Sequence, residues 1–206
     1  MKPTAAELRA LERRDPVLGA AMRGLPPFPD FPVGILRGSH FHALARSIIY
    51  QQLATAAAAA IYGRVRDLTA GPRFPTPEEV LAMDEAEFRG AGLSAGKVRA
   101  LRDLSGKTVS GELGLHRIGR LPDGEIVSRL TTVWGIGEWT AQIFLIFKLG
   151  RPDVMPAGDL GIREGLRILD GLDERPDPRF VMERAERWRP LRSVAAWFLW
   201  RLKDAG

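Results

Sequence analysis

A single carboxylate follows a rigid loop in the C-terminal part of the chain. Asp159 comes directly after Met155-Pro156-Ala157-Gly158, and an apolar helical pattern begins at Leu160. We expect Asp159 to cap that helix, whose positive end favours an ionised carboxylate. A carboxylate fixed in this way can stabilise positive charge developing on a substrate, or take a proton from water. Asp153 is a weaker candidate, because it follows Pro152 and suits a turn.

Two apolar helical segments upstream of this loop are separated only by Gly135-Ile136-Gly137. Glycine tolerates positive φ, so we expect the two glycines to permit a tight reversal. The free N–H groups at the start of the second segment, near Trp139 and Thr140, would then face outward, where a phosphate can bind. A phosphate-binding hairpin followed by an acid predicts chemistry on DNA.

This combination resembles the helix-hairpin-helix superfamily of DNA glycosylases, and within it the 3-methyladenine DNA glycosylase II class, which removes alkylated bases. The resemblance covers most of the chain. The matching segments are Ile49-Tyr50-Gln51-Gln52-Leu53, Gly92-Leu93-Ser94 with Lys97, the hairpin, residues 156–161, and residues 188–193 running on to Trp200. It implies that Asp159 is the catalytic residue.

The resemblance also suggests the type of reaction. In the branches that cleave the DNA backbone as well, a lysine at the position of Trp139 attacks the sugar. Trp139 offers no amine, so we expect a monofunctional hydrolase that uses water as its nucleophile. Trp139 and Trp200 match pocket tryptophans of the class, and we expect Ile143 and Phe144 to influence which base is accepted. Aromatic walls suit cationic alkylated purines, which leave readily without a general acid.

DNA contacts follow from the same resemblance. In the family, a side chain at the position of Gln52 enters the duplex and fills the gap left by the flipped base, and Gln51 would support it. Lys97 matches a DNA-binding position, although it could equally be a solvated helix residue. The remaining expected phosphate contacts come from the hairpin, from Gly135, Ile136, Gly137 and Thr140. No cofactor is required, but Na⁺ or K⁺ could bridge the carbonyls of Gly135 and Gly137 to a phosphate.

Composition is compatible with an anionic partner. The 206 residues carry a formal net charge of +5, and arginine greatly outnumbers lysine, which suits bidentate phosphate contacts. Arg189, Arg192 and Arg201 could add to a basic face. The absence of cysteine excludes disulfides, thiolate zinc sites and cysteine-bound iron–sulfur clusters, and the three histidines make no convincing metal site.

The sequence contains no apolar run near the ~20 residues that a membrane span needs, and no signal-peptide pattern. We therefore expect a cytoplasmic protein, associated with the nucleoid in a bacterium, with no membrane partner. The expected partner is double-stranded DNA that contains alkylated bases, bound by a monomer.

Apolar residues recur at helical spacing throughout, and alternating strand patterns are scarce, so the expected fold class is all-α. The resemblance implies two helical lobes with a DNA-binding cleft between them: residues 43–150 with the helix-hairpin-helix motif, and residues 1–42 plus 151–206 with the catalytic Asp. No N-terminal β domain is expected. The expected helices are 4–22, 41–53, 55–68, a short one from Thr76, 95–105, 122–133, 138–149, 160–169, 180–188 and 194–203, with an extended connector at 25–32.

Two alternatives remain open. A non-catalytic helix-hairpin-helix DNA-binding module would carry the hairpin, but Asp159 and the pocket tryptophans argue against it. A glycosylase/lyase for other damaged bases would need a lysine, and Trp139 in that position argues against it.

Overall fold

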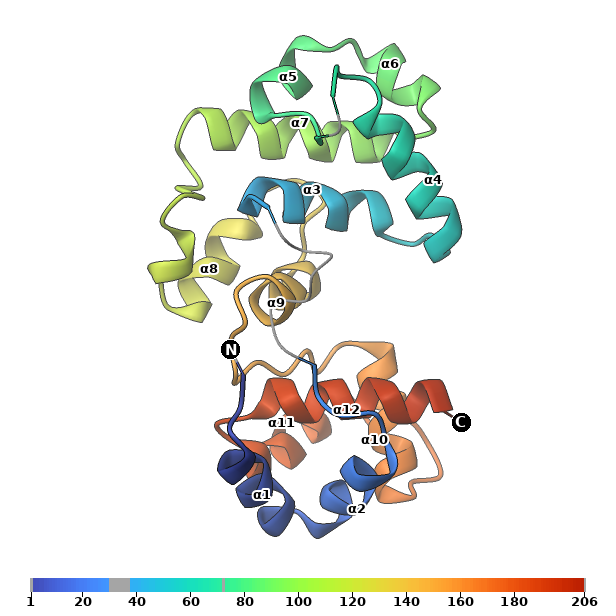
Figure 1. Ribbon diagram of the computed structural model, residues 1–206, viewed down its shortest axis with the longest axis vertical. Helices are drawn as coiled ribbons and strands as arrows, with labels where there is room; N and C mark the ends of the chain where they lie inside the picture. The colour runs from blue at the N-terminus through green and yellow to red at the C-terminus, as the bar shows by residue number, and fades with distance from the viewer. Residues whose placement is uncertain (1, 30–37, 72, 206) are drawn as a thin grey trace. The chain divides into compact units, whose positions relative to one another are not determined.

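The computed structural model describes every residue except 1, 30–37, 72 and 206. Helices account for all the regular structure of the described residues, which contain no strand, so the all-α expectation is confirmed (Figure 1). The chain divides into two compact units: one holds residues up to 35 and from 145 onward, and the other holds residues 36–144. No helix in the described part of the chain is both long enough and apolar enough to cross a membrane.

The unit of residues 36–144 contains the hairpin. The last helix, α9, begins in this unit and runs on into the other. α3 packs against both α4 and α7, and α5 packs against α7. Its elements, in chain order, are α3 (His40–Tyr50), α4 (Thr55–Arg66), α5 (Pro77–Ala82), α6 (Glu85–Gly90), α7 (Ala95–Val109), the 3₁₀ turn η2 (Ile118–Arg120), α8 (Asp123–Leu130) and α9 (Glu138–Phe147).

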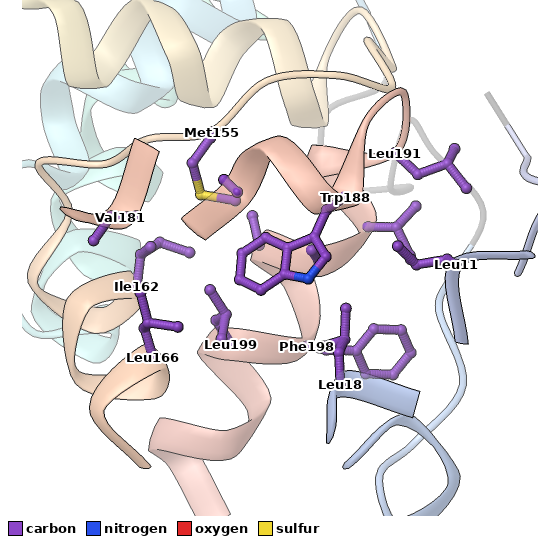
Figure 2. Packing of buried hydrophobic residues seen from close by; sticks show 14 of the residues in the cluster. Leu11, Leu18, Met155, Ile162, Leu166, Val181, Trp188, Leu191, Phe198 and Leu199 are labelled. Carbon is purple, nitrogen blue, oxygen red and sulfur yellow. The ribbon is translucent and has the colours of Figure 1, made fainter. Parts of the chain in front are cut away.

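The other unit packs its helices around Trp188, which is completely buried (Figure 2). α10 and α12 approach each other closely, since a Cβ added to Gly165 would lie 2.1 Å from the carbonyl oxygen of Leu199. Only glycine permits this contact, so this position fixes how α10 lies on α12. The elements are α1 (Ala5–Arg14), α2 (Pro16–Gly24), α10 (Leu160–Asp170), α11 (Pro178–Ala185), the 3₁₀ turn η3 (Glu186–Trp188) and α12 (Arg192–Ala205).

The expected first helix, 4–22, is wrong as a single helix. It breaks at Asp15, which ends α1 and caps α2 by accepting a hydrogen bond from the Leu18 N–H at 3.1 Å. Pro16 is the cause, because proline lacks an N–H and fits the first turn of a helix but not its interior. Asp15 also accepts from Trp188 Nε1 at 2.7 Å and pairs with Arg184.

Other helix ends differ from expectation by a few residues. α7 continues to Val109, and α8 stops at Leu130, so that residues 131–137 form the reversal. The expected connector is non-helical over Leu25–Pro29 as predicted, and its residues 30–32 lie outside the described residues.

Candidate nucleic-acid interface and active-site carboxylate

The candidate residues fall into two groups, one in each unit. The first group surrounds the hairpin between α8 and α9. The second surrounds the start of α10 and contains Asp159.

The hairpin reverses at one glycine rather than two. Gly135 has φ of +81°, whereas Gly137 is not in the left-handed region. A Cβ added to Gly135 would lie 3.1 Å from Ala100 Cβ, but one added to Gly137 would meet nothing within 4 Å. The expectation that both glycines make the turn is therefore wrong for Gly137. Its bare backbone faces open space, which leaves room for a phosphate at the start of α9.

Ile136 and Thr140 hold the hairpin from inside, since both are almost fully buried. Trp139 is 45% exposed, which excludes a core role within this unit. Ile143, one turn later, is partly exposed, whereas Phe144 is 2% exposed and packs edge-on against His40, with ring centroids 5.7 Å apart. The prediction for Phe144 as a pocket residue is therefore not supported by its position, because it faces the core.

A hollow of about 570 Å³ lies beside Trp139, lined by Arg46, Ser47, Tyr50, Gln51, Gln52, Gly135, Trp139, Thr140 and Ile143. Sequence reasoning missed Arg46, Ser47 and Tyr50. Their helical spacing could have identified them, because they share one face of α3 with Gln51. The Arg46 guanidinium lies 3.8 Å from the centre of the Tyr50 ring, a cation–π arrangement that holds both side chains at the edge of the hollow.

Gln51 connects the end of α3 to the hairpin. Its Nε2 donates to the carbonyl oxygen of Gly135 at 3.0 Å and to Thr140 Oγ1 at 3.1 Å. Gln52, next along the chain, is exposed and has φ of +55°. A non-glycine residue in this conformation stores backbone strain, which often marks a functional position.

The Lys97 ammonium donates to the carbonyl oxygens of Ile49 at 2.6 Å and Gln51 at 2.9 Å. Burial lowers the pKa of Lys97. Lys97 is therefore not the solvated helix residue that one interpretation allowed.

A monovalent cation at the hairpin stays a prediction. The carbonyl of Gly135 already accepts from Gln51, and that of Gly137 accepts from the N–H of Ala141 at 3.1 Å. Among the described residues, no group of three or more His, Asp and Glu side chains could hold a metal ion. A carbonyl oxygen has two lone pairs, so these hydrogen bonds do not decide whether Na⁺ or K⁺ binds there, and no step of the reaction is derived from such an ion.

Asp159 caps α10, as predicted. Its Oδ1 accepts from the backbone N–H of Ile162 at 2.8 Å and from the indole Nε1 of Trp200 at 2.9 Å. A Cβ added to Gly161 would lie 3.0 Å from both Asp159 Oδ1 and Trp200 Cδ1, so the glycine leaves room for this pair. Trp200 is half-buried, and its ring lies beside Phe147, with centroids 5.5 Å apart.

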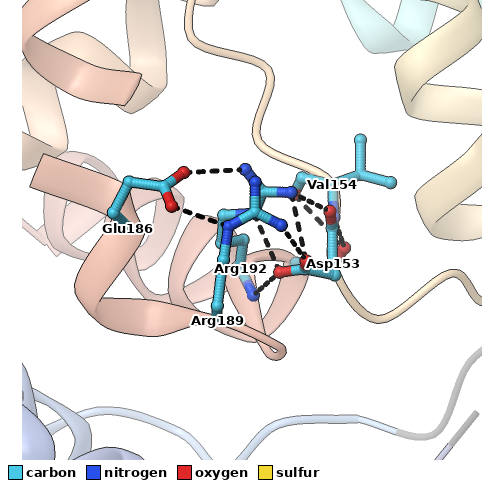
Figure 3. Close-up of polar contacts among 6 residues, drawn as sticks. Asp153, Val154, Glu186, Arg189 and Arg192 are labelled. Carbon is cyan, nitrogen blue, oxygen red and sulfur yellow. Dashed lines mark hydrogen bonds and ion pairs between the residues drawn. The ribbon is translucent and has the colours of Figure 1, made fainter. Parts of the chain in front are cut away.

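The loop before Asp159 is fixed by the start of α12. Ser193 donates its N–H to Pro152 O at 2.9 Å, and its Oγ accepts from Val154 N at 3.0 Å. Arg192, only 9% exposed, donates to both the carboxylate and the carbonyl of Asp153 (Figure 3). Asp153 is thus engaged as a structural anchor and not as a competing catalytic acid.

The three arginines expected on a basic face are ion-paired. Arg189 binds Asp153 and Glu186, and Arg192 binds Asp153 (Figure 3). Arg201 binds Asp204. Their charges are largely neutralised within the protein, so they add less to phosphate attraction than the sequence suggested.

Comparison with known proteins supports the resemblance to helix-hairpin-helix DNA glycosylases. Residues 45–190 match the family model described as HhH-GPD superfamily base excision DNA repair protein. The DNA-3-methyladenine glycosylase 1 of Schizosaccharomyces pombe is 41% identical over 162 residues, which cover 78% of this chain and 71% of that protein.

Two solved structures are also similar. One is the S. pombe 3-methyladenine DNA glycosylase in complex with abasic DNA, with TM-score 0.79 and 36% identity, covering 95% of this chain and 93% of that one. The other is a Bacillus halodurans DNA-3-methyladenine glycosidase, with TM-score 0.85 and 30% identity, covering 98% and 91%.

Proposed function

This chain belongs to the HhH-GPD superfamily of base excision DNA repair proteins, and we propose that it is a monofunctional DNA glycosylase that hydrolyses the N-glycosidic bond of alkylated bases in double-stranded DNA. Bases such as 3-methyladenine and 7-methylguanine are the substrates that we expect. The observation that carries the proposal is the carboxylate of Asp159, oriented at the start of α10 by Ile162 and Trp200.

The chemistry follows from the charge that develops. As the bond between the sugar C1′ and the base nitrogen breaks, its electron pair leaves with the base and positive charge develops on the sugar. An anion near that centre stabilises the transition state electrostatically, and the Asp159 carboxylate supplies it. Water then bonds to C1′ and loses a proton to Asp159 or to solvent, which leaves an abasic site.

The hairpin and the hollow beside Trp139 support the proposed binding of DNA. The N–H groups at the start of α9 suit a phosphate, and the open space at Gly137 permits its approach. The exposed ring of Trp139 suits stacking against a flipped, cationic purine. Gln52, exposed and held in a strained conformation, suits the gap that such a base leaves in the duplex.

Two alternative functions fit less well. A non-catalytic DNA-binding module would need Asp159 only to cap α10, which leaves the second donor to its carboxylate, Trp200, without a role. A glycosylase/lyase needs an amine at the position of Trp139, and the Lys97 ammonium is already bonded to two carbonyls.

The deciding experiment is release of free base from methylated duplex DNA, analysed by chromatography. The wild-type protein should release 3-methyladenine and 7-methylguanine and leave intact abasic strands. DNA binding without release of any base would favour the binding module. Strand cleavage that accompanies base release would favour the lyase.

A further inference from the structure

Lys97 of α7 completes the end of another helix. The last carbonyls of an α-helix have no partner within the helix. At the end of α3, two of these carbonyls, of Ile49 and Gln51, accept hydrogen bonds from the Lys97 ammonium at 2.6 and 2.9 Å. Lys97 therefore fixes the direction in which the chain leaves α3.

The residue that follows is the strained one. Gln52, with φ of +55°, is the one non-glycine residue in the described part of the chain with positive φ. Such a conformation is strained and persists only where the surroundings impose it. Gln51 is held at two points, by Lys97 at its backbone carbonyl and by the hairpin at its side-chain amide. The residue that precedes the strained Gln52 is therefore fixed in position.

The same face of α7 also holds the hairpin. Lys97, Ala100 and Asp103 recur at a spacing of three residues, which keeps them on one side of a helix. Asp103 Oδ2 accepts from the backbone N–H of Trp134 at 2.7 Å, and Ala100 packs under Gly135. α7 packs against α3 (Figure 1). A single face of α7 therefore contacts both the turn before Gln52 and the hairpin.

We propose that Lys97 is a positioning residue, which acts on DNA through Gln52 by fixing the turn that presents this side chain to the duplex, and not by a phosphate contact of its own. The inference rests on the proposed function, in which Gln52 fills the gap of a flipped base. The partial burial that lowers the pKa of Lys97 fits this role, because the ammonium has exchanged water for two carbonyl oxygens.

The test is a double-mutant cycle on DNA affinity. Lys97→Met, Gln52→Ala and the double variant are titrated against an undamaged duplex and against one with a tetrahydrofuran abasic-site analogue. If Lys97 acts through Gln52, each single variant loses about tenfold in preference for the abasic duplex, and the double variant loses no more than about twofold beyond Gln52→Ala. If the losses multiply, Lys97 acts independently and the proposal is wrong.

The salt dependence of binding to undamaged duplex gives the second readout. A lysine that contacts a phosphate contributes about one unit to the slope of log affinity against log salt. We expect Lys97→Met to leave the slope unchanged, and a decrease of about one unit would overturn the proposal. Lys107→Met is the matched control, since it removes the same charge from the same helix, at a residue paired with Glu112, and should leave both readouts unchanged.

Folding and function are checked separately. If Lys97→Met does not fold, the cycle is run with Lys97→Arg, which keeps donors for the two carbonyls in a different geometry, and the same additivity criterion decides. The cycle needs no catalysis. Failure of the wild-type protein to release base would therefore refute the glycosylase proposal and leave the result of the cycle readable.

Discussion

The indole of Trp200 donates a hydrogen bond to the carboxylate of Asp159, with 2.9 Å between Nε1 and Oδ1. The same oxygen accepts from the backbone N–H of Ile162 at 2.8 Å. Two donors from different helices, α12 and α10, therefore fix the orientation of one carboxylate oxygen. A carboxylate that is already oriented needs little reorganisation when positive charge develops on a substrate. Such preorganisation is the condition for effective electrostatic catalysis.

Asp159→Asn should abolish base release while it preserves the fold and the binding of abasic duplex. Asparagine caps helices about as well as aspartate, so the start of α10 should remain intact. Loss of the anion should cost ~3 kcal/mol or more in the barrier, which is about a hundredfold or more in rate. Single-turnover release of base from methylated DNA measures the effect.

Asp177→Asn is the control for that variant. Asp177 caps α11 by accepting from the N–H of Phe180 at 2.8 Å, so the substitution makes the same chemical change at another helix start. It should excise at the wild-type rate. If Asp159→Asn also excised at close to that rate, Asp159 would have no part in the mechanism.

Trp200→Phe should slow excision about tenfold with little change in melting temperature. The substitution keeps an aromatic ring beside Phe147 and removes only the donor to the carboxylate, and a hydrogen bond to a charged group contributes about 1.5–3 kcal/mol. Trp188→Phe makes the matched comparison, because Trp188 Nε1 donates to Asp15 inside the core. It should lower the melting temperature and leave the rate per folded molecule unchanged. The reverse pattern would assign the Trp200 hydrogen bond to stability.

Local signals predicted much of this arrangement. The Asp before an apolar helix gave the cap at Asp159, and the glycines around Ile136 gave the position of the hairpin, because both depend only on neighbouring residues. The break at Asp15 also has a local signal in Pro16, but the apolar periodicity on either side of it favours a single helix.

The contacts that organise the candidate site could not be predicted in this way. Gln51 reaches Gly135, and Lys97 reaches Ile49, across long stretches of chain that only the packing of α3, α7 and the hairpin brings together. Phe144 illustrates a further limit. The apolar pattern of α9 does not say which of two adjacent residues faces the core, and Phe144 does while Ile143 borders the hollow.

The two hairpin glycines should respond differently to alanine. Gly135→Ala should destabilise the fold by about 1–2 kcal/mol, because alanine at φ of +81° is strained and its Cβ would press on Ala100. Gly137→Ala should leave the melting temperature unchanged and weaken binding to damaged and undamaged duplex alike, because the methyl group would occupy the space that we assign to a phosphate. Thermal unfolding and fluorescence anisotropy measure the two effects. If Gly137→Ala bound duplex as tightly as wild type, the start of α9 would not be the phosphate contact.

Trp139→Ala should reduce excision of 3-methyladenine without unfolding the protein, because the residue is 45% exposed and contributes little to the core. Stacking of a base on an aromatic side chain contributes roughly 1–3 kcal/mol, so the rate should fall about tenfold. An unchanged rate would show that Trp139 does not bind the base.

The wild-type protein should not be trapped on DNA by borohydride, which reduces an imine to a permanent crosslink. The hypothesis rests on Trp139 standing where a lyase would have its lysine. A covalent band on a denaturing gel would show that another amine attacks the sugar. Lys148, whose pKa is lowered by burial, would then be the first residue to replace, because desolvation is what makes a lysine nucleophilic at neutral pH.

Trp139→Lys should lose excision without gaining such a band, since a lysine there would also need a lowered pKa and the correct approach to the sugar.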